Sequence, residues 1–250
     1  MENLIDDLIK LAFAEDIGDG DHTTLCCIPE DAEGAQKLIV KEDGVLAGVE
    51  MAKRIFAAFD PTLKMEQFLN DGDEVKVGDI AFIVRGKVRS LLQTERLMLN
   101  VMQRMSGIAT VTRRYARQLE GLKTRVLDTR KTTPGLRMIE KEAVKIGGGV
   151  NHRIGLFDMI LLKDNHVDFA GGITNAIKRA QSYLKEKGKD LKIEIEVRNL
   201  DELQEAIDCG GIDRIMLDNF TPELTRKAVE IIDGRFETES SGGITFDTLR

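Results

Sequence analysis

The fold is decided by residues 128–166, which contain DTRKTTPGLR (128–137), GGGVNHR (147–153) and LKDNH (162–166) between short apolar runs. The part from Asp128 to Arg153 carries six Lys or Arg against three Asp or Glu, although the whole chain has a formal net charge of -7. A cationic, glycine-rich segment beside apolar runs is typical of an anion-binding site. A solvated basic surface is the alternative interpretation.

Composition and charge place the chain among soluble globular proteins. It has 250 residues, 42% of them hydrophobic and 32% charged, and no apolar run approaches the roughly 18 residues that span a membrane. The N-terminus is acidic and amphipathic, so we expect no secretion signal. The net negative charge argues against general nucleic-acid binding. Cys26, Cys27 and Cys209 form no disulfide or zinc pattern, so we expect reduced thiols and a cytoplasmic protein.

The first 106 residues mix helical and strand-like patterns and are predicted to form a small α+β sandwich domain. The predicted helices lie at 3–14 and 49–59, and the predicted strands lie at 37–41, 45–48, 63–69 and 80–84. Asp71-Gly72 predicts a strand–turn–strand hairpin. We assign His22-Thr23-Thr24 to a loop, in which His22 is a local hydrogen-bonding group. A long helix over 90–120, broken at Gly107, is predicted to bridge to a second domain.

Residues 107–250 show a regular strand–helix repeat. The predicted strands cover 125–127, 158–162, 193–197, 214–217 and 236–238, and the helices after them cover 136–146, 172–187, 201–208, 222–232 and a segment that starts near Thr245. Alternating units of this length form parallel sheets. The predicted fold class is therefore α/β, with an incomplete parallel α/β barrel at 107–250 preceded by the small α+β sandwich domain at 1–106.

A polar cluster stands at the end of each predicted strand of this repeat. The clusters are Asp128 to Lys131, Lys163 to His166, Glu196, Asp218-Asn219 and Glu239 to Gly243. The carboxyl ends of parallel strands meet at one face of an α/β barrel, and barrel enzymes build their sites there. Helix N-caps and surface charges would explain one or two such clusters, whereas five favour an active site.

The residue types in these clusters favour a substrate with several negative charges. The cations, together with one imidazole, are Arg130, Lys131, His152, Arg153 and Lys163. Arg suits planar carboxylates and Lys suits phosphate. Glu196 and Asp218 suit sugar hydroxyls, or a Mg²⁺ ion that substrate phosphates also hold. The Ser241-Gly242-Gly243 turn offers backbone N–H groups to a phosphate.

Taken together, these motifs resemble the quinolinate phosphoribosyltransferase family, also called carboxylating nicotinate-nucleotide pyrophosphorylases. The resemblance is carried by EDIGDGD (15–21), DTRKTTPGLR (128–137), GGGVNHR (147–153), KDNH (163–166), EIEV (194–197), LDNF (217–220) and ESSGG (239–243). It implies an α/β sandwich, an incomplete barrel and a homodimer. The implied reaction converts quinolinate and phosphoribosyl pyrophosphate, with Mg²⁺, into nicotinate mononucleotide, CO₂ and pyrophosphate.

The resemblance also implies roles for individual residues. The quinolinate-binding residues would be Arg96, Arg130, His152, Arg153 and Lys163. The residues that bind phosphoribosyl pyrophosphate would be Lys131, Glu196, Asp218, Ser241, Gly242 and Gly243. The catalytic residues would be Lys131, Lys163, Glu196 and Asp218. Mg²⁺ would be held through the substrate, with Glu196 and Asp218 as its candidate protein ligands, and Arg96 would act across the dimer interface.

Three other interpretations stay open at this level. One is the paralogous pyrophosphorylase group found with molybdenum-uptake genes, against which the implied quinolinate-binding set favours the transferase. Another is a barrel aldolase that forms a Schiff base on Lys163 or Lys131. The family pattern continues past the position of Arg250 with a strand and a phosphate loop, so we expect a truncated chain. A non-catalytic, assembly-only fragment is therefore the third interpretation.

Overall fold

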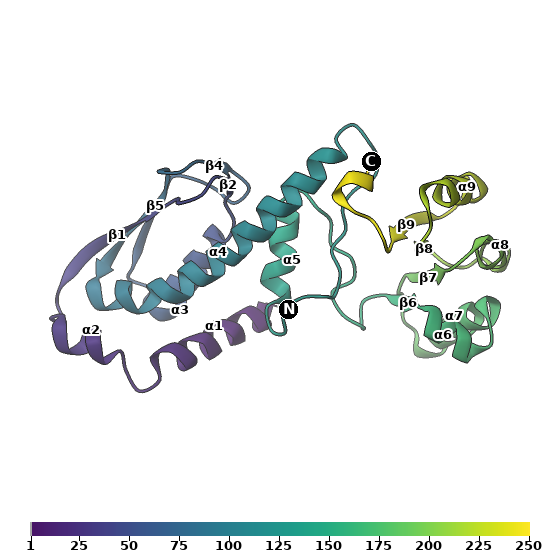
Figure 1. The fold of residues 1–250 in the computed structure, drawn as a ribbon. Helices are drawn as coiled ribbons and strands as arrows, with labels where there is room; N and C mark the ends of the chain where they lie inside the picture. Colours follow the sequence, from purple (N-terminus) through teal and green to yellow (C-terminus); the bar gives the residue numbers. More distant parts are fainter. Residues whose placement is uncertain (1) are drawn as a thin grey trace. The chain divides into compact units, whose positions relative to one another are not determined.

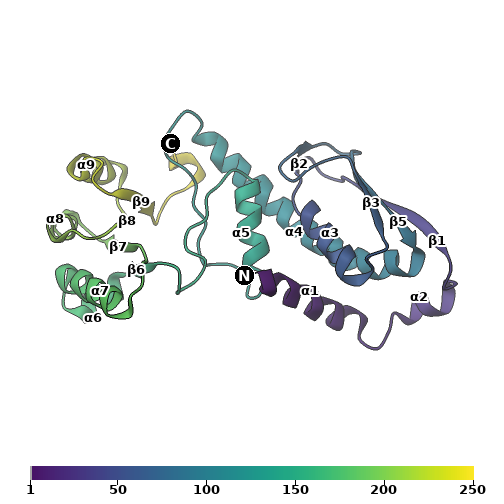
Figure 2. The same ribbon diagram turned by 180° about the vertical axis from the view of Figure 1, so that it is seen from behind.

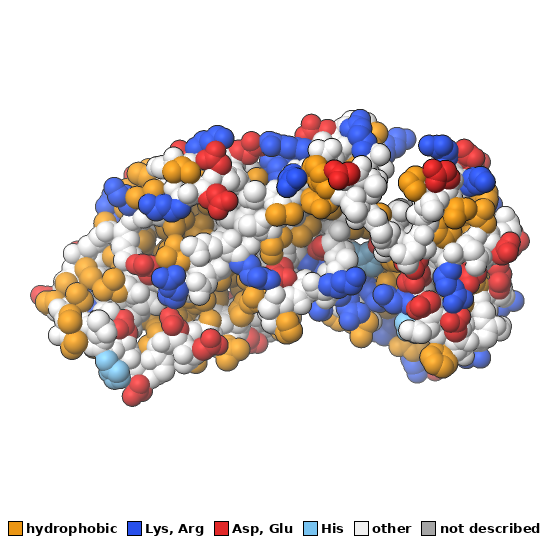
Figure 3. Space-filling view, in the orientation of Figure 1, with side chains coloured by type: hydrophobic (Ala, Val, Ile, Leu, Met, Phe, Trp, Pro, Cys, Tyr) orange, Lys and Arg blue, Asp and Glu red, His pale blue; other side chains and the backbone are white. Residues whose placement is uncertain are grey.

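A computed structural model describes residues 2–250 of the chain, and its elements are labelled in Figure 1. These residues form two compact units, which divide between His152 and Arg153. No helix within residues 2–250 combines the length and the apolar character that crossing a membrane requires. On the face drawn in Figure 3, Lys and Arg side chains of each unit are interspersed with Asp and Glu.

The first unit combines helices with two antiparallel sheets. Its helices are α1 (Glu2–Ile17), α2 (His22–Cys27), α3 (Val49–Phe59), α4 (Val88–Gln118) and α5 (Arg137–Ile146). Its strands are β1 (Glu33–Ile39), β2 (Gly44–Val45), β3 (Lys64–Gln67), β4 (Glu74–Val75) and β5 (Ile80–Lys87). One sheet has the order β1-β5-β3, and the other pairs β2 with β4. The two opposite views both place α3 and α4 beside the three-stranded sheet (Figures 1 and 2).

The core of the first unit lies between these two helices and the sheet. Its fully buried side chains include Ala52, Ile55, Phe82, Leu91, Met105 and Ala109. The buried residues of α3 and α4 recur every three or four positions, as one face of a helix requires. Because burying one large apolar side chain stabilises a fold by about 1.5–3 kcal/mol, this packing holds α4 firmly against α3 and the sheet.

The long helix α4 corrects the prediction of a break at Gly107, because it continues from Val88 to Gln118. Met105 and Ala109, on either side of this glycine, are only 1% and 0% exposed. A glycine inside a helix costs only about 0.5–1 kcal/mol relative to alanine. The packing of the neighbouring turns outweighs that cost, so the helix passes through the glycine.

The two predicted strands on either side of Asp71-Gly72 do pair antiparallel, as β3 with β5, but their connection is longer than a tight turn because it contains β4. β4 pairs with β2, with Gly44 opposite Val75, while β5 lies between β1 and β3. The turn itself lies where the Asp-Gly sequence predicts it, and the backbone N–H of Gly72 donates to the carbonyl of Leu46 (2.8 Å). The strand β4 is short, so contacts with residues distant in the sequence determine its pairing partner. The Asp-Gly turn signal does not predict that partner.

Two further segments of the first unit differ from the prediction. His22-Thr23-Thr24 is the first turn of α2 and not a loop, because Asp21 caps this helix by accepting a hydrogen bond from the backbone N–H of Thr24 (3.0 Å). The predicted strand at 125–127 is reduced to one parallel bridge between Leu127 and Val150. Only glycines separate Val150 from the end of α5, so few residues are extended there. A longer strand pairing with residues 125–127 therefore does not form.

The second unit is a parallel α/β structure. Its strands are β6 (Ile160–Leu162), β7 (Ile193–Val197), β8 (Arg214–Asp218) and β9 (Glu237–Ser241), which pair in this order and are all parallel. Its helices are α6 (Asp164–Ala170), α7 (Ile173–Lys187), α8 (Leu200–Cys209) and α9 (Pro222–Ile232), followed by a 3₁₀ turn at Phe246–Thr248. Figure 1 shows α7, α8 and α9 along one face of the sheet. The predicted class, a parallel α/β domain after a small sheet domain, is confirmed.

Two boundaries in the second unit correct the prediction. β9 extends to Ser241, so Glu239 and Ser241 lie within the strand and not after it. α6 begins at Asp164, directly after Lys163, so most of the polar cluster from Lys163 to His166 belongs to a helix that was not predicted. The side chain of His166 makes this possible, since its Nδ1 accepts a hydrogen bond from the backbone N–H of Lys163 (3.0 Å) and caps the helix.

Candidate active site

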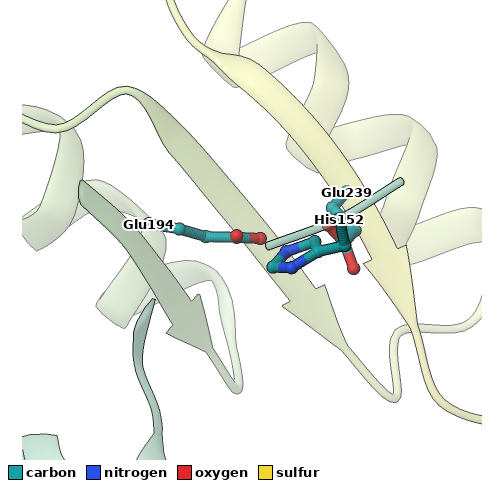
Figure 4. A group of neighbouring side chains, drawn as sticks. All are labelled: His152, Glu194 and Glu239. Carbon is teal, nitrogen blue, oxygen red and sulfur yellow. The ribbon is translucent and has the colours of Figure 1, made fainter. Parts of the chain in front are cut away.

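The two faces of the parallel sheet differ in chemistry. One face packs into the apolar core with α7, α8 and α9, and it carries Ile193, Ile195, Val197, Ile215 and Leu217, each at most 4% exposed. Because side chains alternate along a strand, the other face carries Glu194, Glu196, Arg214, Asp218, Glu239 and Ser241. Figure 4 shows Glu194 and Glu239 extending from β7 and β9, and it also labels His152, the last residue of the first unit. The second unit therefore presents a polar sheet face.

Arg214 pairs with three carboxylates on this face. Its guanidinium lies 2.8 Å from Glu237, 3.4 Å from Glu239 and 3.8 Å from Glu194. The side chain of Glu194 is 0% exposed, so attraction to Arg214 offsets the loss of hydration of that carboxylate. Glu194 and Arg214 are not among the predicted site residues. The alternation of Glu with Ile in IEIEV (193–197) could have indicated Glu194, since side chains alternate between the two faces of a strand.

Glu196 lies near the end of β7 and is 8% exposed. Burial raises the pKa of its carboxyl, and the charges of Asp218 and Asp164 raise it as well, whereas Lys163 and the backbone N–H of Asp164 lower it. Glu196 is paired in register with Met216, so Asp218, two residues further along β8, lies on the same face. The structure thus brings two carboxylates and a lysine together at the carboxyl ends of neighbouring strands.

A Glu196→Gln variant is expected to be more stable than the wild type at neutral pH in the absence of substrates. The raised pKa means that the folded protein holds the Glu196 proton more tightly than the unfolded chain does, so the charged carboxylate weakens the fold as the pH rises above its ordinary pKa of 4.5. Thermal denaturation at pH 7 should show a higher midpoint for the variant. Below pH 4.5 the two midpoints should converge. A lower midpoint at pH 7 would contradict the prediction.

Asp218 is tied to the turn that follows β9. The side-chain amide of Asn219 donates to Asp218 Oδ2 (2.7 Å), and the backbone N–H of Asn219 donates to the carbonyl of Ser241 (2.8 Å). Gly242 has a left-handed φ of 82°, and a Cβ there would lie 2.2 Å from the Asn219 side-chain oxygen. Only glycine fits this approach without displacing Asn219. The Ser241-Gly242-Gly243 turn and Asp218 therefore form one structural element.

The first unit contains the cationic loop DTRKTTPGLR (128–137), which helices α4 and α5 hold in place. Arg137 donates to the carbonyl of Arg130 (3.4 Å), and Arg104 donates to the hydroxyl of Thr133 (2.6 Å). The buried Nε of Arg130 makes no hydrogen bond with any residue of the described range 2–250. Lys131 is exposed. These two side chains are therefore the candidates in this loop for binding an anion.

The predicted site residues divide between the two units. The first unit holds Arg96, Arg130, Lys131 and His152, and the second holds Arg153, Lys163, Glu196, Asp218, Ser241, Gly242 and Gly243. In the second unit, Arg153 donates to the carbonyl of Met159 just before β6 (3.2 Å). In the first unit, Arg96 is exposed on α4 and stands apart from the cationic loop. It precedes Arg104 by eight residues, which is about 12 Å along a helix axis.

Two family models match the chain. The model described as quinolinate phosphoribosyl transferase, N-terminal domain, matches residues 21–106, and the model of the C-terminal domain matches residues 108–250. The chain is 46% identical to the chloroplastic nicotinate-nucleotide pyrophosphorylase (carboxylating) of Arabidopsis thaliana, over 97% of this chain and 73% of that protein. It is 40% identical to the probable nicotinate-nucleotide pyrophosphorylase (carboxylating) of Bacillus subtilis, over 97% of this chain and 82% of that protein.

Solved structures show the same likeness. The structure of NadC from Streptococcus pyogenes matches with a TM-score of 0.92 and 40% identity, over 100% of this chain and 87% of that chain. The nicotinate-nucleotide pyrophosphorylase from Francisella tularensis matches with a TM-score of 0.91 and 38% identity, over 100% of this chain and 86% of that chain. The likeness therefore covers sequence and fold along the whole described chain.

Proposed function

Because the chain belongs to the quinolinate phosphoribosyltransferase family, we propose that it transfers the phosphoribosyl group of phosphoribosyl pyrophosphate to the ring nitrogen of quinolinate. The products are nicotinate mononucleotide, CO₂ and pyrophosphate, as in the de novo biosynthesis of NAD. The observation that carries the proposal is the carboxylate pair of Glu196 and Asp218 beside Lys163, at the carboxyl ends of the parallel strands. The cationic loop with Arg130 and Lys131 gives further support.

Quinolinate is a dianion with two carboxylates on adjacent ring carbons, so its binding requires several cations. The proposed quinolinate-binding residues are Arg96, Arg130, His152, Arg153 and Lys163. An Arg side chain can hold a carboxylate with two parallel hydrogen bonds, which fixes the orientation of the ring as well as its position. The ring nitrogen attacks with its own lone pair, so the first step needs no general base. These residues act by placing that nitrogen against the anomeric carbon.

The phosphoribosyl side of the proposed site fits Mg²⁺. Glu196 and Asp218 supply carboxylate oxygens, which are ligands that this ion prefers. Mg²⁺ usually binds only one or two protein carboxylates and takes its other ligands from substrate phosphates and water. A cation between them would relieve the repulsion from Asp218 that raises the pKa of Glu196. When bound, the ion would neutralise charge on the departing pyrophosphate. Lys131 and the Ser241-Gly242-Gly243 turn would hold phosphate oxygens.

The proposed chemistry has two stages. The ring nitrogen forms a bond to the anomeric carbon while the bond from that carbon to pyrophosphate breaks, and pyrophosphate leaves with the electron pair. Lys131, Lys163 and the acids Glu196 and Asp218 act by electrostatic stabilisation of this charge separation. The ribosylated ring is a pyridinium, which accepts the electron pair left when the adjacent carboxylate departs as CO₂. A proton from water then takes the place of CO₂ on that carbon.

We extend the proposal to a homodimer in which Arg96 of one protomer completes the site of the other. The exposed position of Arg96, about 12 Å along α4 from Arg104 at the cationic loop, supports supply from a second copy. Mixing inactive Arg96→Ala and Arg153→Ala proteins is expected to restore about a quarter of the sites, because each heterodimer contains one intact site. Product formation in the mixture checks this. An inactive mixture that contains heterodimers would contradict it.

The proposed function is tested by incubating the purified protein with quinolinate, phosphoribosyl pyrophosphate and Mg²⁺. Nicotinate mononucleotide and CO₂ should form in equal amounts. Nicotinate serves as the control, because it lacks the carboxylate that leaves and should release no CO₂. Calorimetric titration should show tighter binding of quinolinate than of nicotinate. The absence of product, or equal binding of the two acids, would overturn the proposal.

We propose the cytoplasm as the compartment. Cys26 and Cys27 are exposed free thiols whose sulfur atoms lie 3.4 Å apart, and such thiols persist in a reducing environment. The compartment differs among the relatives, since several plant proteins carry chloroplastic or mitochondrial in their names.

Family membership favours the quinolinate transferase over the Schiff-base aldolase and over the pyrophosphorylase group of molybdenum-uptake clusters.

A further inference from the structure

A buried ion pair joins the cationic loop of the first unit to helix α5. Lys141 Nζ lies 2.5 Å from Asp128 Oδ1, and the two side chains are only 3% and 7% exposed. The proposed chemistry uses neither residue. By contrast, Lys145 lies one turn further along α5 and pairs with Glu142 at the surface (2.7 Å), where its side chain is 53% exposed. The Asp128–Lys141 pair is thus set apart by its burial.

The pair holds the backbone of His152 from both sides. The backbone N–H of His152 donates to Asp128 Oδ1 (2.8 Å), and Lys141 Nζ donates to the carbonyl of His152 (3.1 Å). With the Asn151 amide assigned so that its nitrogen faces the surrounding acceptors, it donates to Asp128 Oδ2 (2.8 Å) and to the carbonyl of Lys141 (2.9 Å). Next to it, Asp128 and Val150 are joined by a backbone hydrogen bond (3.1 Å). Two segments distant in sequence are therefore held side by side.

These segments carry three of the five residues proposed for quinolinate, together with Lys131, which is proposed for phosphoribosyl pyrophosphate. Arg130 and Lys131 follow Asp128 by two and three residues, and Arg153 directly follows His152. We propose that Asp128 and Lys141 are positioning residues, which set the spacing between the cationic loop and the His152-Arg153 segment. This inference rests on the proposed function, and it adds to that function a buried pair that touches no substrate.

The chemistry of the pair explains why apolar residues would not serve as well. The backbone N–H and carbonyl of His152 both need hydrogen-bond partners where they are shielded from water. A carboxylate accepts several hydrogen bonds at once, and an ammonium donates three. Asp128 accepts from Lys141, His152 and Asn151 together. An apolar pair could fill the same volume, but it would leave the His152 backbone without these contacts.

The test compares Lys141→Met, the double variant Asp128→Asn/Lys141→Met, and the control Lys145→Met. Lys141→Met should lower the thermal midpoint, because it leaves the buried Asp128 charge unpaired. The double variant contains no unpaired charge and should regain most of that stability. Quinolinate affinity, measured by calorimetry, should nevertheless stay about tenfold to a hundredfold weaker in the double variant, since small misplacement of binding groups has effects of that order. The Lys145→Met control should match the wild type.

Two further measurements separate positioning from stability. Amide hydrogen exchange of His152 should be faster in the double variant than in the wild type. Phosphoribosyl pyrophosphate affinity should fall less than quinolinate affinity, since three of the five proposed quinolinate residues adjoin the pair. Wild-type quinolinate affinity in the double variant, or unchanged exchange at His152, would overturn the inference. Failure of the wild type to bind quinolinate would instead overturn the proposed function, and exchange at His152 would still report whether the pair holds this backbone.

Discussion

The Arg130→Ala variant is expected to bind quinolinate more weakly by a factor of about 30 to 4000, which corresponds to the ~2–5 kcal/mol lost when a desolvated charge is left without its partner. Arg130 lies in a loop that Arg137 and Arg104 hold in place, so the deletion should remove the charge without moving the backbone. Its buried Nε makes no hydrogen bond with the described residues, as expected of a side chain kept for a ligand. Calorimetric titration with quinolinate measures the effect.

Two companion variants make this measurement specific. Arg130→Lys keeps the charge but loses the planar fork, so its affinity should lie between those of the wild type and Arg130→Ala. Arg125→Ala removes an exposed arginine five residues earlier, outside the cationic loop, and should bind quinolinate like the wild type. If Arg130→Ala and Arg125→Ala bind quinolinate equally well, Arg130 does not contact a carboxylate of the substrate.

The Gly147→Ala variant is expected to lose about 1–3 kcal/mol of unfolding free energy, as is usual when an extra carbon is forced into a packed contact. Gly147 lies at the end of α5, where the backbone approaches α4. A Cβ there would lie 2.5 Å from the carbonyl oxygen of Ala109 and 2.6 Å from Cβ of Thr112. The first of these atoms belongs to the backbone of a long packed helix, so it cannot move aside. Urea unfolding followed by circular dichroism measures the loss.

The same substitution at Gly107 provides the matched control, because the opposite sign is expected. Gly107 lies inside α4, and among the described residues nothing beyond its own helix would come within 4 Å of an added Cβ. Alanine should therefore stabilise this helix by about 0.5–1 kcal/mol. Equal effects of the two substitutions would contradict the close approach of α5 to α4 at Gly147.

Periodicity and motif spacing predicted much of the fold. Apolar spacing located α3, α4 and α7, and polar residues at the ends of the predicted strands led to the prediction of Lys163, Glu196 and Asp218 as site residues. Local patterns failed where tertiary contacts decide. The break at Gly107 was wrong because packing on both sides of a glycine keeps a helix continuous. The α6 helix was missed because its cap is a histidine side chain, which sequence rules for caps do not include.

The buried charges of the site could be predicted only in part. Glu194 and Arg214 are 20 residues apart in the sequence and pair across neighbouring strands. The sequence alone does not give the register of these strands, so it could not predict the pair. The same limit applies to Asp128 and Lys141, which the sequence shows only as members of a charged segment. Motifs predicted candidate substrate-binding residues, whereas the buried pairs that contact the same segments could be found only through the fold.

The two-faced sheet also restricts how this chain can change in length. Insertion of one residue into β7 would exchange its two faces, because side chains alternate with a period of two. Ile195 would then lie on the polar face, while the carboxylate of Glu196 would enter the apolar layer beneath α7 and α8. Strands of this sheet therefore keep their two faces when residues are gained or lost in pairs, whereas the connections at the opposite end, such as the one after α7, are not subject to this alternation. Insertions and deletions in β6 to β9 are thus far more restricted than substitutions on their polar face.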